Sequence, residues 1–583
     1  MRGLPAIAPG REGGRQPFRV ALIVLGTLIL IAGASQLARA GYSVDEEFTV
    51  FAVRGIQQGG LPHLPSALLY DRGLAYSYAS WIAGWLTGTE LPAYRALSLL
   101  SALASVLLVF AIVRRVATDH AALLAATLVA AALPFWATAT TGRFYAPFLA
   151  SYLGVLFVLT GRGVPLGVLA GVAMVGRLTH ELAFTLVTVP MLCLVFDDRG
   201  QRRRWLAAAA AIVFGLMAAQ GLLFGLHALE PVSGETMVRR FFLWQVLNLF
   251  EVPGDRQYGL VLTLMVVAWV LAPARAAITT VVALSATAMV VAFSLARASN
   301  LGSLDAATVV RVLSDGALYP LDMFRHLASA HSVLTVLALV SLAARLLGAG
   351  GEWRLHERGA HLLWLFWVLW FGVIDSGITT NYLLLPVVMM LAAVAIDVDA
   401  IVGRLLPHRA AFAVVALVAM AIGLDQWRGS GSIHDHLEAE RPTINIPGID
   451  EVRAGLLPAD RVACTDELAC LLLVGRIDRW LALDDFVRDR FLVTRPDGTS
   501  AGVYTGAPAV FRPGDLFTPN ADGTLPDRVL IVDVFKEYPI GDSRSWVPRA
   551  IELDGLQVIP LLEAPQGRVL QISPQERHAG RLP

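Results

Sequence analysis

The chain has 583 residues, of which 56% are hydrophobic and only 16% charged, and its mean hydropathy is +0.62. This composition is far more apolar than a water-soluble protein of this size requires, and it predicts an integral membrane protein. The formal net charge is zero, so no excess of positive charge points to a nucleic-acid partner.

Apolar stretches recur along the first three quarters of the chain, each of roughly 17 to 25 residues and long enough as a helix to cross a hydrocarbon core of about 30 Å. They predict a polytopic α-helical membrane protein with about 13 transmembrane helices. The predicted spans are residues 18–38, 93–113, 119–138, 145–160, 164–177, 180–196, 205–228, 258–273, 276–296, 329–347, 360–376, 382–396 and 410–426.

Arginine clusters between these spans predict the topology. The first span follows several arginines, as in a signal peptide, but its apolar run is longer than a signal core, so we expect it to stay uncleaved. Arg114–Arg115 and Arg202–Arg204 then fall on the same side as the N-terminus, which the positive-inside rule places in the cytoplasm. We therefore expect a multi-pass protein of the inner (cytoplasmic) membrane, with residues 1–17 as a cytoplasmic tail and an extracytoplasmic C-terminus.

The predicted domains differ in composition. Residues 18–428 form the transmembrane domain, including a first outer loop at about 39–92, in which "LAYSYASWIAGWLTG" predicts a helix lying at the membrane interface. From residue 429 apolar runs shorten to strand length, as in "RVACT", "WLALDD", "RVLIVDV", "LQVIPLL" and "RVLQI", and "DELACLLLVGRI" favours a helix. Residues 429–583 are therefore predicted to form a small extracytoplasmic α/β domain.

The three cysteines lack the spacing of a metal site. Cys193 lies in an apolar run, whereas Cys464 and Cys470 lie close together in the C-terminal domain. In an oxidising compartment these two form either a short-loop disulfide or two free thiols, and the sequence leaves both open.

Three consecutive acids, Asp45, Glu46 and Glu47, follow the first span. A carboxylate a few residues beyond the membrane exit can stay ionised in headgroup water and still reach the sugar of a lipid-linked substrate. The alternative is the solvated start of a loop.

The segments after these acids resemble the polytopic glycosyltransferases of the GT-C superfamily, in particular family 39, which includes protein O-mannosyltransferases and the lipid A aminoarabinose transferase. In that family an Asp-Glu pair follows the first helix, then come a short amphipathic helix, a basic or Pro-containing segment, and an Arg in an "xxRLPSAL"-like segment. Here Asp45-Glu46 matches the pair, residues 70–78 the basic segment, and "YRALSLLSAL" with Arg95 the last. The resemblance covers roughly residues 18–400.

Later segments match less closely. "TGRFYAP" contains Arg143, "GRLTHELAFTLVTVP" contains Arg177 and His180, and "TTNYLLLPVVMM" resembles a late helix that opens with a Tyr, here Tyr382. The family's Lys-Pro-Pro is replaced by a sequence containing Arg72, and the Asp that often follows the fourth-helix Arg is absent. These departures favour a different sugar or acceptor.

The resemblance implies an inverting glycosyltransferase that moves a sugar from a polyprenyl-phosphate donor to a hydroxyl of an envelope glycan, lipid or protein on the outer face of the membrane. Asp45 is the expected general base, Glu46 orients it or holds the acceptor, and Glu47 is a solvated bystander. No metal or other cofactor is required. The expected contacts to donor phosphate and substrate are Arg72, Arg143, Arg177, His180 and Tyr382.

Each candidate has a structural alternative. Arg72 and Arg95 can bind lipid headgroups or loop carbonyls, Arg143 and Arg177 can snorkel at helix ends, and His180 can cap a turn with its neighbour Glu181. At the level of function, the alternatives are a transporter or flippase for a lipid-linked saccharide and an envelope scaffold. The spans are poor in mid-membrane acids and show no inverted repeat, which argues against transport.

Overall fold

The computed structural model describes residues 16–39, 41–43, 45–161, 163–190, 193, 201–228, 324–347, 355–374, 380–428, 432, 443–483, 491–495, 497–519, 523–535, 537–538 and 541–574. The predicted spans 258–273 and 276–296 lie outside these residues. The chain divides into two compact units. The first contains the described residues of Met1–Leu37, Tyr94–Leu226 and Phe242–Glu440, and the second those of Ala38–Ala93, His227–Phe241 and Arg441–Pro583. The first outer loop, which the sequence assigned to the transmembrane domain, thus falls in one unit with the C-terminal residues.

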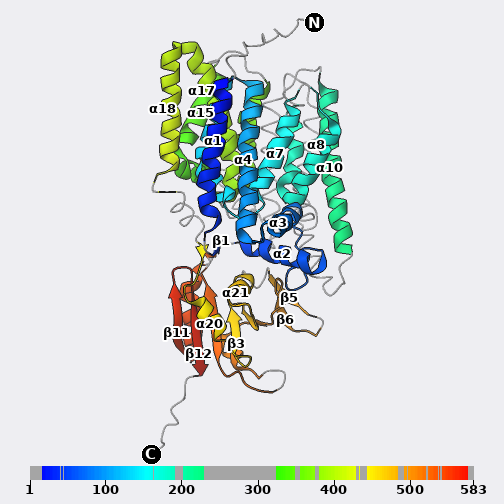
Figure 1. The fold of residues 1–583 in the computed structure, drawn as a ribbon, viewed down its shortest axis with the longest axis vertical. Helices are drawn as coiled ribbons and strands as arrows, with labels where there is room; N and C mark the ends of the chain where they lie inside the picture. Colours follow the sequence, from blue (N-terminus) through cyan, green and yellow to red (C-terminus); the bar gives the residue numbers. More distant parts are fainter. Residues whose placement is uncertain are drawn as a thin grey trace, which may run out of the picture. The chain divides into compact units, whose positions relative to one another are not determined.

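The first unit is helical. A helical segment lies at each predicted span that the structure describes, as Figure 1 shows. These segments are α1 (Gln16–Leu37), α4 (Leu91–Val116), α5 (Asp119–Ala131), α6 (Leu133–Ala139), α7 (Tyr145–Leu159), α8 (Leu166–Thr179), the 3₁₀ helix η2 (Glu181–Val187), α10 (Arg202–Ala228), α15 (Ser332–Leu346), α16 (Leu355–Ile374), α17 (Thr380–Leu405) and α18 (His408–Gln426).

The helices differ in their ability to cross a bilayer. Among the described residues, four are long and apolar enough to span one, or up to six if each of two bent pairs counts as one span. The remaining apolar helices are shorter. The predicted span 119–138 is broken: its residues form α5 and α6, which are bent by 65°. Pro134, in the first turn of α6, causes this break because it has no N–H to donate to the carbonyl of Ala130 and its ring crowds that carbonyl.

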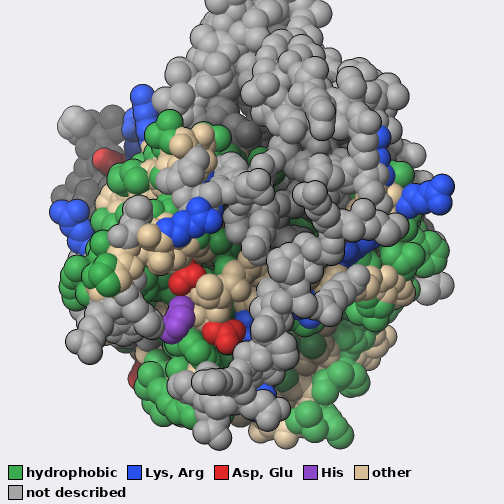
Figure 2. Space-filling model, turned by 90° about the horizontal axis from the view of Figure 1, so that it is seen from above, with side chains coloured by type: hydrophobic (Ala, Val, Ile, Leu, Met, Phe, Trp, Pro, Cys, Tyr) green, Lys and Arg blue, Asp and Glu red, His purple; other side chains and the backbone are tan. Residues whose placement is uncertain are grey.

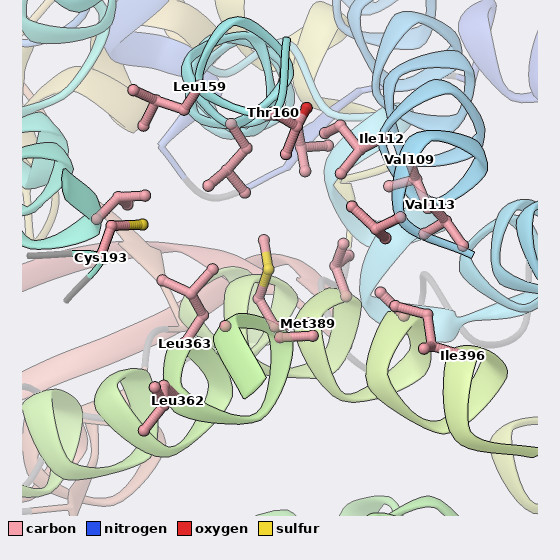
Figure 3. Close-up of a pocket in the computed structure, with 18 of the residues that line it drawn as sticks. Val109, Ile112, Val113, Leu159, Thr160, Cys193, Leu362, Leu363, Met389 and Ile396 are labelled. Atoms are coloured by element: carbon pink, nitrogen blue, oxygen red, sulfur yellow. The ribbon is translucent and has the colours of Figure 1, made fainter. Parts of the chain in front are cut away.

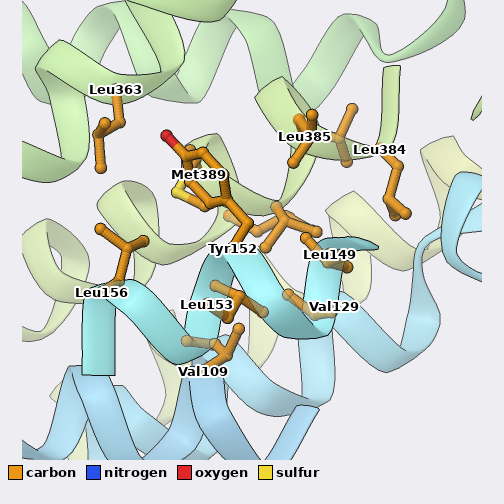
Figure 4. Close-up of a cluster of buried hydrophobic side chains, with 14 of the residues drawn as sticks. Val109, Val129, Leu149, Tyr152, Leu153, Leu156, Leu363, Leu384, Leu385 and Met389 are labelled. Carbon is orange, nitrogen blue, oxygen red and sulfur yellow. The ribbon is translucent and has the colours of Figure 1, made fainter. Parts of the chain in front are cut away.

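The core of this unit is built from the inner faces of these helices. Helices α16 and α17 pack on each other, α5 packs on α17, and α7 packs on α8. Figure 4 shows the centre of the cluster, where Tyr152 of α7 lies among aliphatic side chains that include Leu149 and Met389. Gly215 of α10 allows close approach to α8, since a Cβ there would lie 2.1 Å from the carbonyl oxygen of Ala170.

Arginines tie the helix ends together at one end of this bundle. Arg115 at the end of α4 donates to the carbonyl of Phe157, and Arg204 at the start of α10 donates to the carbonyl of Leu159 at 2.9 Å. Both carbonyls belong to the last turn of α7, so these three helix ends lie at the same end of the bundle. Figure 2 shows a face of the molecule on which arginine side chains stand around a largely hydrophobic surface.

The second unit begins with the first outer loop. Its elements are β1 (Tyr42–Ser43), α2 (Glu46–Gly59) and α3 (Leu74–Thr87). Helix α3 confirms the helix predicted there, and it leaves Ile82, Trp85 and Leu86 exposed. Arg54 of α2 makes an ion pair with Glu90 at 2.9 Å. Strand β1 pairs antiparallel with β2 (Thr443–Ile444), so the loop and the C-terminal residues share a two-stranded sheet.

The C-terminal residues form a mixed six-stranded sheet in the order β11-β12-β8-β3-β4-β7 (Figure 1). Strands β8, β3, β4 and β7 run parallel, whereas β12 is antiparallel to both of its neighbours. The strands are β3 (Arg461–Cys464), β4 (Arg479–Leu481), β7 (Ala509–Val510), β8 (Val529–Val534), β11 (Leu556–Ala564) and β12 (Gly567–Pro574), with helices α20 (Ile449–Ala454), α21 (Glu467–Val474) and α23 (Ser543–Leu553) and the small hairpin β5 (Leu492–Thr494) and β6 (Ser500–Gly502). The predicted α/β composition is therefore present in the described residues.

Helix α21 is attached to the sheet by a covalent bond. Cys464 at the end of β3 and Cys470 of α21 form a disulfide with their Cα atoms 6.0 Å apart, which decides between the two alternatives that the sequence left open. Asp466 caps the helix, since its side chain accepts from the backbone N–H of Ala469 at 2.9 Å. Both features hold the first turn of α21 in place.

Candidate active site

Asp45 lies in the turn between β1 and α2 of the second unit. Its backbone, with φ 76° and ψ −11°, adopts the left-handed conformation, which Asp tolerates better than most residues. The residue directly precedes α2, yet its side chain makes no capping hydrogen bond. Asp45 is half-buried.

The next two acids form the first turn of α2, and both are fully buried. The Oε2 atom of Glu46 accepts a hydrogen bond from the backbone N–H of Ser43 at 2.7 Å. This bond links the residues that precede and follow Asp45. The solvated position expected for Glu47 is wrong. The amphipathic helix buries its first turn, where the partial positive charge of the helix N-terminus favours a carboxylate.

Tyr504 lies in a turn of the C-terminal residues. Burial raises the pKa of the Tyr504 hydroxyl well above its usual value; the charge of Arg72 opposes that rise, whereas Glu467, Tyr70 and Asp45 add to it. The charges of both Asp45 and Arg72 thus act on the pKa of this phenol. No local pattern in the sequence links Tyr504 to a residue more than 400 positions earlier.

Aromatic rings connect this phenol to the acidic turn. Phe48, three residues after Asp45, stacks on Tyr70 with ring centres 5.5 Å apart and meets Tyr504 edge-on at 4.9 Å. Stacked and edge-to-face arrangements are the two favoured geometries for such rings. The first turn of α2 is therefore packed from both the outer loop and the C-terminal residues.

Glu467 is a second residue that the sequence did not single out, because an acid in a first helical turn is common. It is 3% exposed. Its Oε1 accepts from the hydroxyl and N–H of Thr505, and its Oε2 accepts from the N–H of Tyr504 at 3.3 Å. Burial raises the pKa of the Glu467 carboxyl to about 7, although the hydrogen bonds from Thr505 and Tyr504 oppose the rise.

In the first unit, Arg143 and His180 lie in two neighbouring turns. Arg143 is in the turn between α6 and α7, and His180 joins α8 to η2. The Phe144 ring lies 5.0 Å from the His180 ring and 4.4 Å from the guanidinium carbon of Arg143. Both predicted residues are buried. The structure thus brings them together at the end of the bundle where α7 begins and α8 ends.

His180 caps the turn between α8 and η2, which is the structural alternative to a substrate contact. Its Nδ1 accepts a hydrogen bond from the N–H of Leu182 at 3.0 Å and lies 3.5 Å from a carboxylate oxygen of Glu181. The Tyr145 and Phe148 rings stand 5.7 and 5.1 Å from the His180 ring. His180 therefore stabilises the turn between the two helices, as the sequence allowed.

Arg177 and Arg95 are held inside the first unit. Arg177 donates to the side-chain oxygen of Gln220 at 2.9 Å and is 2% exposed, which differs from the snorkelling alternative. Arg95 is fully buried and donates to the carbonyl of Leu37 at 3.3 Å, as the loop-carbonyl alternative predicted. Tyr382 lies in the first turn of α17, but its side chain is outside the described part of the chain.

Other parts of the structure offer less chemistry. Among the described residues, no group of three His, Cys, Asp or Glu side chains is placed to hold a metal ion. A cavity of about 100 Å³ lies between α4, α7, α10, α16 and α17, and Figure 3 shows apolar side chains such as Val109, Leu363 and Met389 pointing into it. None of the residues that line it is charged. Thr160 and Cys193 are the polar residues among those that line it.

The chemistry available differs between the two units. The second offers the Asp45 carboxylate, which can accept a proton, and the Arg72 guanidinium, which can donate hydrogen bonds to an anion. The first offers buried guanidinium groups beside aromatic rings at one end of its helices.

No protein-family model matches the chain, and no curated protein matches it. Solved structures do. The archaeal oligosaccharyltransferase AglB from Archaeoglobus fulgidus, in complex with an inhibitory peptide and a dolichol-phosphate, matches with a TM-score of 0.50 and 12% identity, over 90% of this chain and 70% of that chain. ArnT from Cupriavidus metallidurans, bound to undecaprenyl phosphate, matches with a TM-score of 0.47 and 15% identity, over 94% of this chain and 97% of that chain. Both proteins are members of the GT-C superfamily. The likeness to AglB shows that this chain shares the fold of that oligosaccharyltransferase, in agreement with the fold class that its sequence pattern predicted.

Proposed function

We propose that this chain is an inverting glycosyltransferase that moves a sugar from a polyprenyl-phosphate donor to a hydroxyl of an envelope glycan, lipid or protein. The observation that carries the proposal is the acidic turn. Asp45 follows the first apolar helix in a left-handed conformation, and Phe48, three residues later in the same turn, packs against the Tyr504 ring at 4.9 Å.

The proposed chemistry assigns the proton to Asp45. An alcohol is a poor nucleophile near neutral pH, and a positioned carboxylate that accepts its proton lowers the barrier by general-base catalysis. The acceptor oxygen then bonds to the anomeric carbon, the bond from that carbon to the phosphate oxygen breaks, and its electron pair leaves on the phosphate. In-line attack inverts the anomeric centre. Glu46 supports Asp45 by holding Ser43.

The leaving phosphate needs positive charge and hydrogen-bond donors rather than a proton. Arg72 is the proposed donor in the second unit. Arg143, Arg177, His180 and Tyr382 remain proposed contacts in the first unit, where the aromatic packing of Arg143 orients its guanidinium. A guanidinium binds a phosphate through two parallel hydrogen bonds. The scheme requires no metal ion.

The fold supports a lipid-linked donor. The AglB structure that matches this chain contains a dolichol-phosphate and an inhibitory peptide, so the same fold in that protein holds a lipid phosphate. We carry over only the class of donor, a polyprenyl phosphate.

We further propose that the chain lies in the inner membrane with residues 1–17 in the cytoplasm and the C-terminal domain outside. The arginines that tie helix ends together, Arg115 and Arg204, lie at one end of the bundle, as the positive-inside rule expects for the cytoplasmic side. The disulfide of the C-terminal domain fits an oxidising compartment. Exposed Trp85 and its apolar neighbours on α3 suit a helix at the membrane interface.

One observation favours the alternative of a transporter or flippase for a lipid-linked saccharide. Asp397 of α17 is 1% exposed and contacts Arg345 and His361, each at 2.7 Å. The predicted span ended one residue before Asp397, so this buried acid was not expected inside a membrane helix. Ionisable groups inside membrane helices often mark transport pathways. However, both oxygens of Asp397 are engaged, which suits a structural network better than a moving charge.

The deciding experiment is the substitution Asp45→Asn in the full chain, expressed in a strain that lacks the native gene. Mass spectrometry of envelope glycans, lipids and proteins first identifies the sugar that disappears on deletion. The Asn variant is expected to insert normally and to restore none of that sugar, whereas Asp450→Asn, at an exposed residue of the C-terminal domain, restores all of it. Full restoration by Asp45→Asn excludes the proposed mechanism and leaves transport as the better explanation.

A further inference from the structure

The C-terminal residues contact the chain just before the acidic turn. Tyr42 and Ser43 of β1 pair with Ile444 and Thr443 of β2. The Tyr42 hydroxyl also donates to the carbonyl oxygen of Ala469, on α21, at 3.1 Å. The backbone that leads into Asp45 is thus held by both a strand and a helix from the C-terminal domain.

The same domain contacts the chain just after the turn. Tyr504 meets the Phe48 ring, and its own ring packs on Phe491 with centres 5.3 Å apart. Its carbonyl oxygen accepts a hydrogen bond from the backbone N–H of Ser66 at 3.0 Å. Tyr504 therefore touches the outer loop at two points, one of them three residues beyond Asp45.

Glu467 fixes the turn that carries Tyr504. Its carboxylate accepts hydrogen bonds from Tyr504 and Thr505. It also lies so close to the backbone of Gly502 that no side chain fits between them. A Cβ on Gly502 would lie 1.8 Å from the Glu467 Oε1, a distance that real atoms do not adopt. The position at 502 is thus restricted to glycine by the carboxylate itself.

We propose that Tyr504, held in place by Glu467, is a positioning residue through which the C-terminal domain fixes Asp45 in its left-handed turn. Only the expected effect on sugar transfer rests on the proposed function; the positioning of the turn at Asp45 does not. It assigns a role to residues 443–574, whose presence the acid-base scheme alone does not explain.

The backbone of Asp45 gives the physical reason. A residue other than glycine in the left-handed region is strained and persists only where its surroundings hold it. Here β2 and α21 hold the residues before it, and Tyr504 packs on the residue three positions after it. A general base displaced by about 1 Å can lose on the order of 100-fold in rate. The packing of β2, α21 and Tyr504 around the turn at Asp45 therefore matters more for reaction rate than for the stability of the whole chain.

The first test measures structure alone. Hydrogen–deuterium exchange of the full chain in lipid nanodiscs follows the peptide that covers residues 42–52. Tyr504→Ala is expected to increase exchange there at least tenfold, and Gly502→Ala, which displaces Glu467, should have a similar effect. Tyr504→Phe keeps the ring and should leave exchange unchanged. Phe511→Ala removes a partly exposed ring elsewhere in the same domain and is the matched control.

The second test uses the sugar identified by deletion. Tyr504→Ala should reduce its transfer about 100-fold at saturating donor while leaving the amount of inserted protein unchanged, and Tyr504→Phe should restore transfer. Unchanged exchange in residues 42–52 of Tyr504→Ala overturns the positioning role, whatever happens to transfer. Loss of transfer in Tyr504→Phe with normal exchange also overturns it, because the hydroxyl would then act on the substrate directly. Increased exchange in Tyr504→Ala together with full activity of Asp45→Asn upholds the positioning role of Tyr504 and rejects the proposed function.

Discussion

Two carboxylates, one from each unit of this protein, are buried in different ways. In the first, Asp397 lies between two basic side chains, Arg345 and His361, and each of its oxygens has a partner at 2.7 Å. In the second, Glu467 accepts hydrogen bonds only from neutral groups, and Asp45 sits half-buried in a strained turn. A carboxylate neutralised by cations stabilises a structure, whereas one held by neutral donors or backbone strain keeps its capacity to take up a proton. Burial alone therefore does not identify a reactive acid.

The largest effect on stability is expected at Asp397. Asp397→Ala leaves the buried guanidinium of Arg345 without its counter-charge, which should lower the free energy of unfolding by about 3–5 kcal/mol. Thermal unfolding in detergent micelles measures the change. Asp399→Ala, two residues later on α17, removes only a hydrogen bond from Thr118 and should cost about 1 kcal/mol. Equal decreases in the free energy of unfolding of the two variants would show that the contacts of Asp397 with Arg345 and His361 contribute no more than an exposed hydrogen bond.

Glu467 should make the stability of the C-terminal domain depend on pH. Its pKa is about 7 in the folded chain against an ordinary value of 4.5, so between those values the folded state holds a proton that the unfolded state has released. Stability therefore falls as the pH rises from about 4.5 to 7, by about 3 kcal/mol in all, and changes little above that range.

Glu467→Gln should abolish this slope. Denaturant unfolding of the full chain at pH 5 and pH 8, followed through the exchange of α21, compares the two proteins. The neighbouring Asp466 adds to the rise of the Glu467 pKa, so Asp466→Asn should shift the slope to slightly lower pH without removing it. An identical pH slope in wild type and Glu467→Gln would contradict the assignment.

The disulfide contributes a smaller amount to the second unit. Because Cys464 and Cys470 close a loop of only a few residues, replacing both by Ala should lower the free energy of unfolding by about 2 kcal/mol. Unfolding of the C-terminal domain with and without reductant measures this. Cys193→Ala, at the free cysteine of the first unit, is the control and should respond to reductant as the wild type does.

The smallest effect on stability is expected at Asp45 itself. Asn tolerates the left-handed conformation as well as Asp does, so Asp45→Asn should change the free energy of unfolding by less than about 0.5 kcal/mol. Asp45→Gly, which relieves the backbone strain, should stabilise the chain by up to about 1 kcal/mol. A large destabilisation in Asp45→Asn would mean that the carboxylate, like that of Asp397, has a structural role.

Several features followed from the sequence. Hydropathy placed the helices, because a span is a local property of about twenty consecutive residues. Short apolar runs located β3, β4, β8, β11 and β12, and "DELACLLLVGRI" located helix α21. The acidic turn and the basic turns at Arg143 and His180 were also found from local patterns and their order. The bend at Pro134 was missed although its cause is local, whereas the burial of Glu47 and the ionic partners of Asp397 were missed because each depends on packing against distant residues.

The sequence by itself determined the class of protein, the positions of its helices and the acidic turn, since these depend on composition and on neighbours along the chain. Only the tertiary structure decided that the outer loop belongs with the C-terminal residues, that Cys464 is bonded to Cys470, and that Tyr504 and Glu467 support the turn at Asp45. The physical reason is that these contacts join residues through pairing and packing, whose partners carry no recognisable signal in either segment alone.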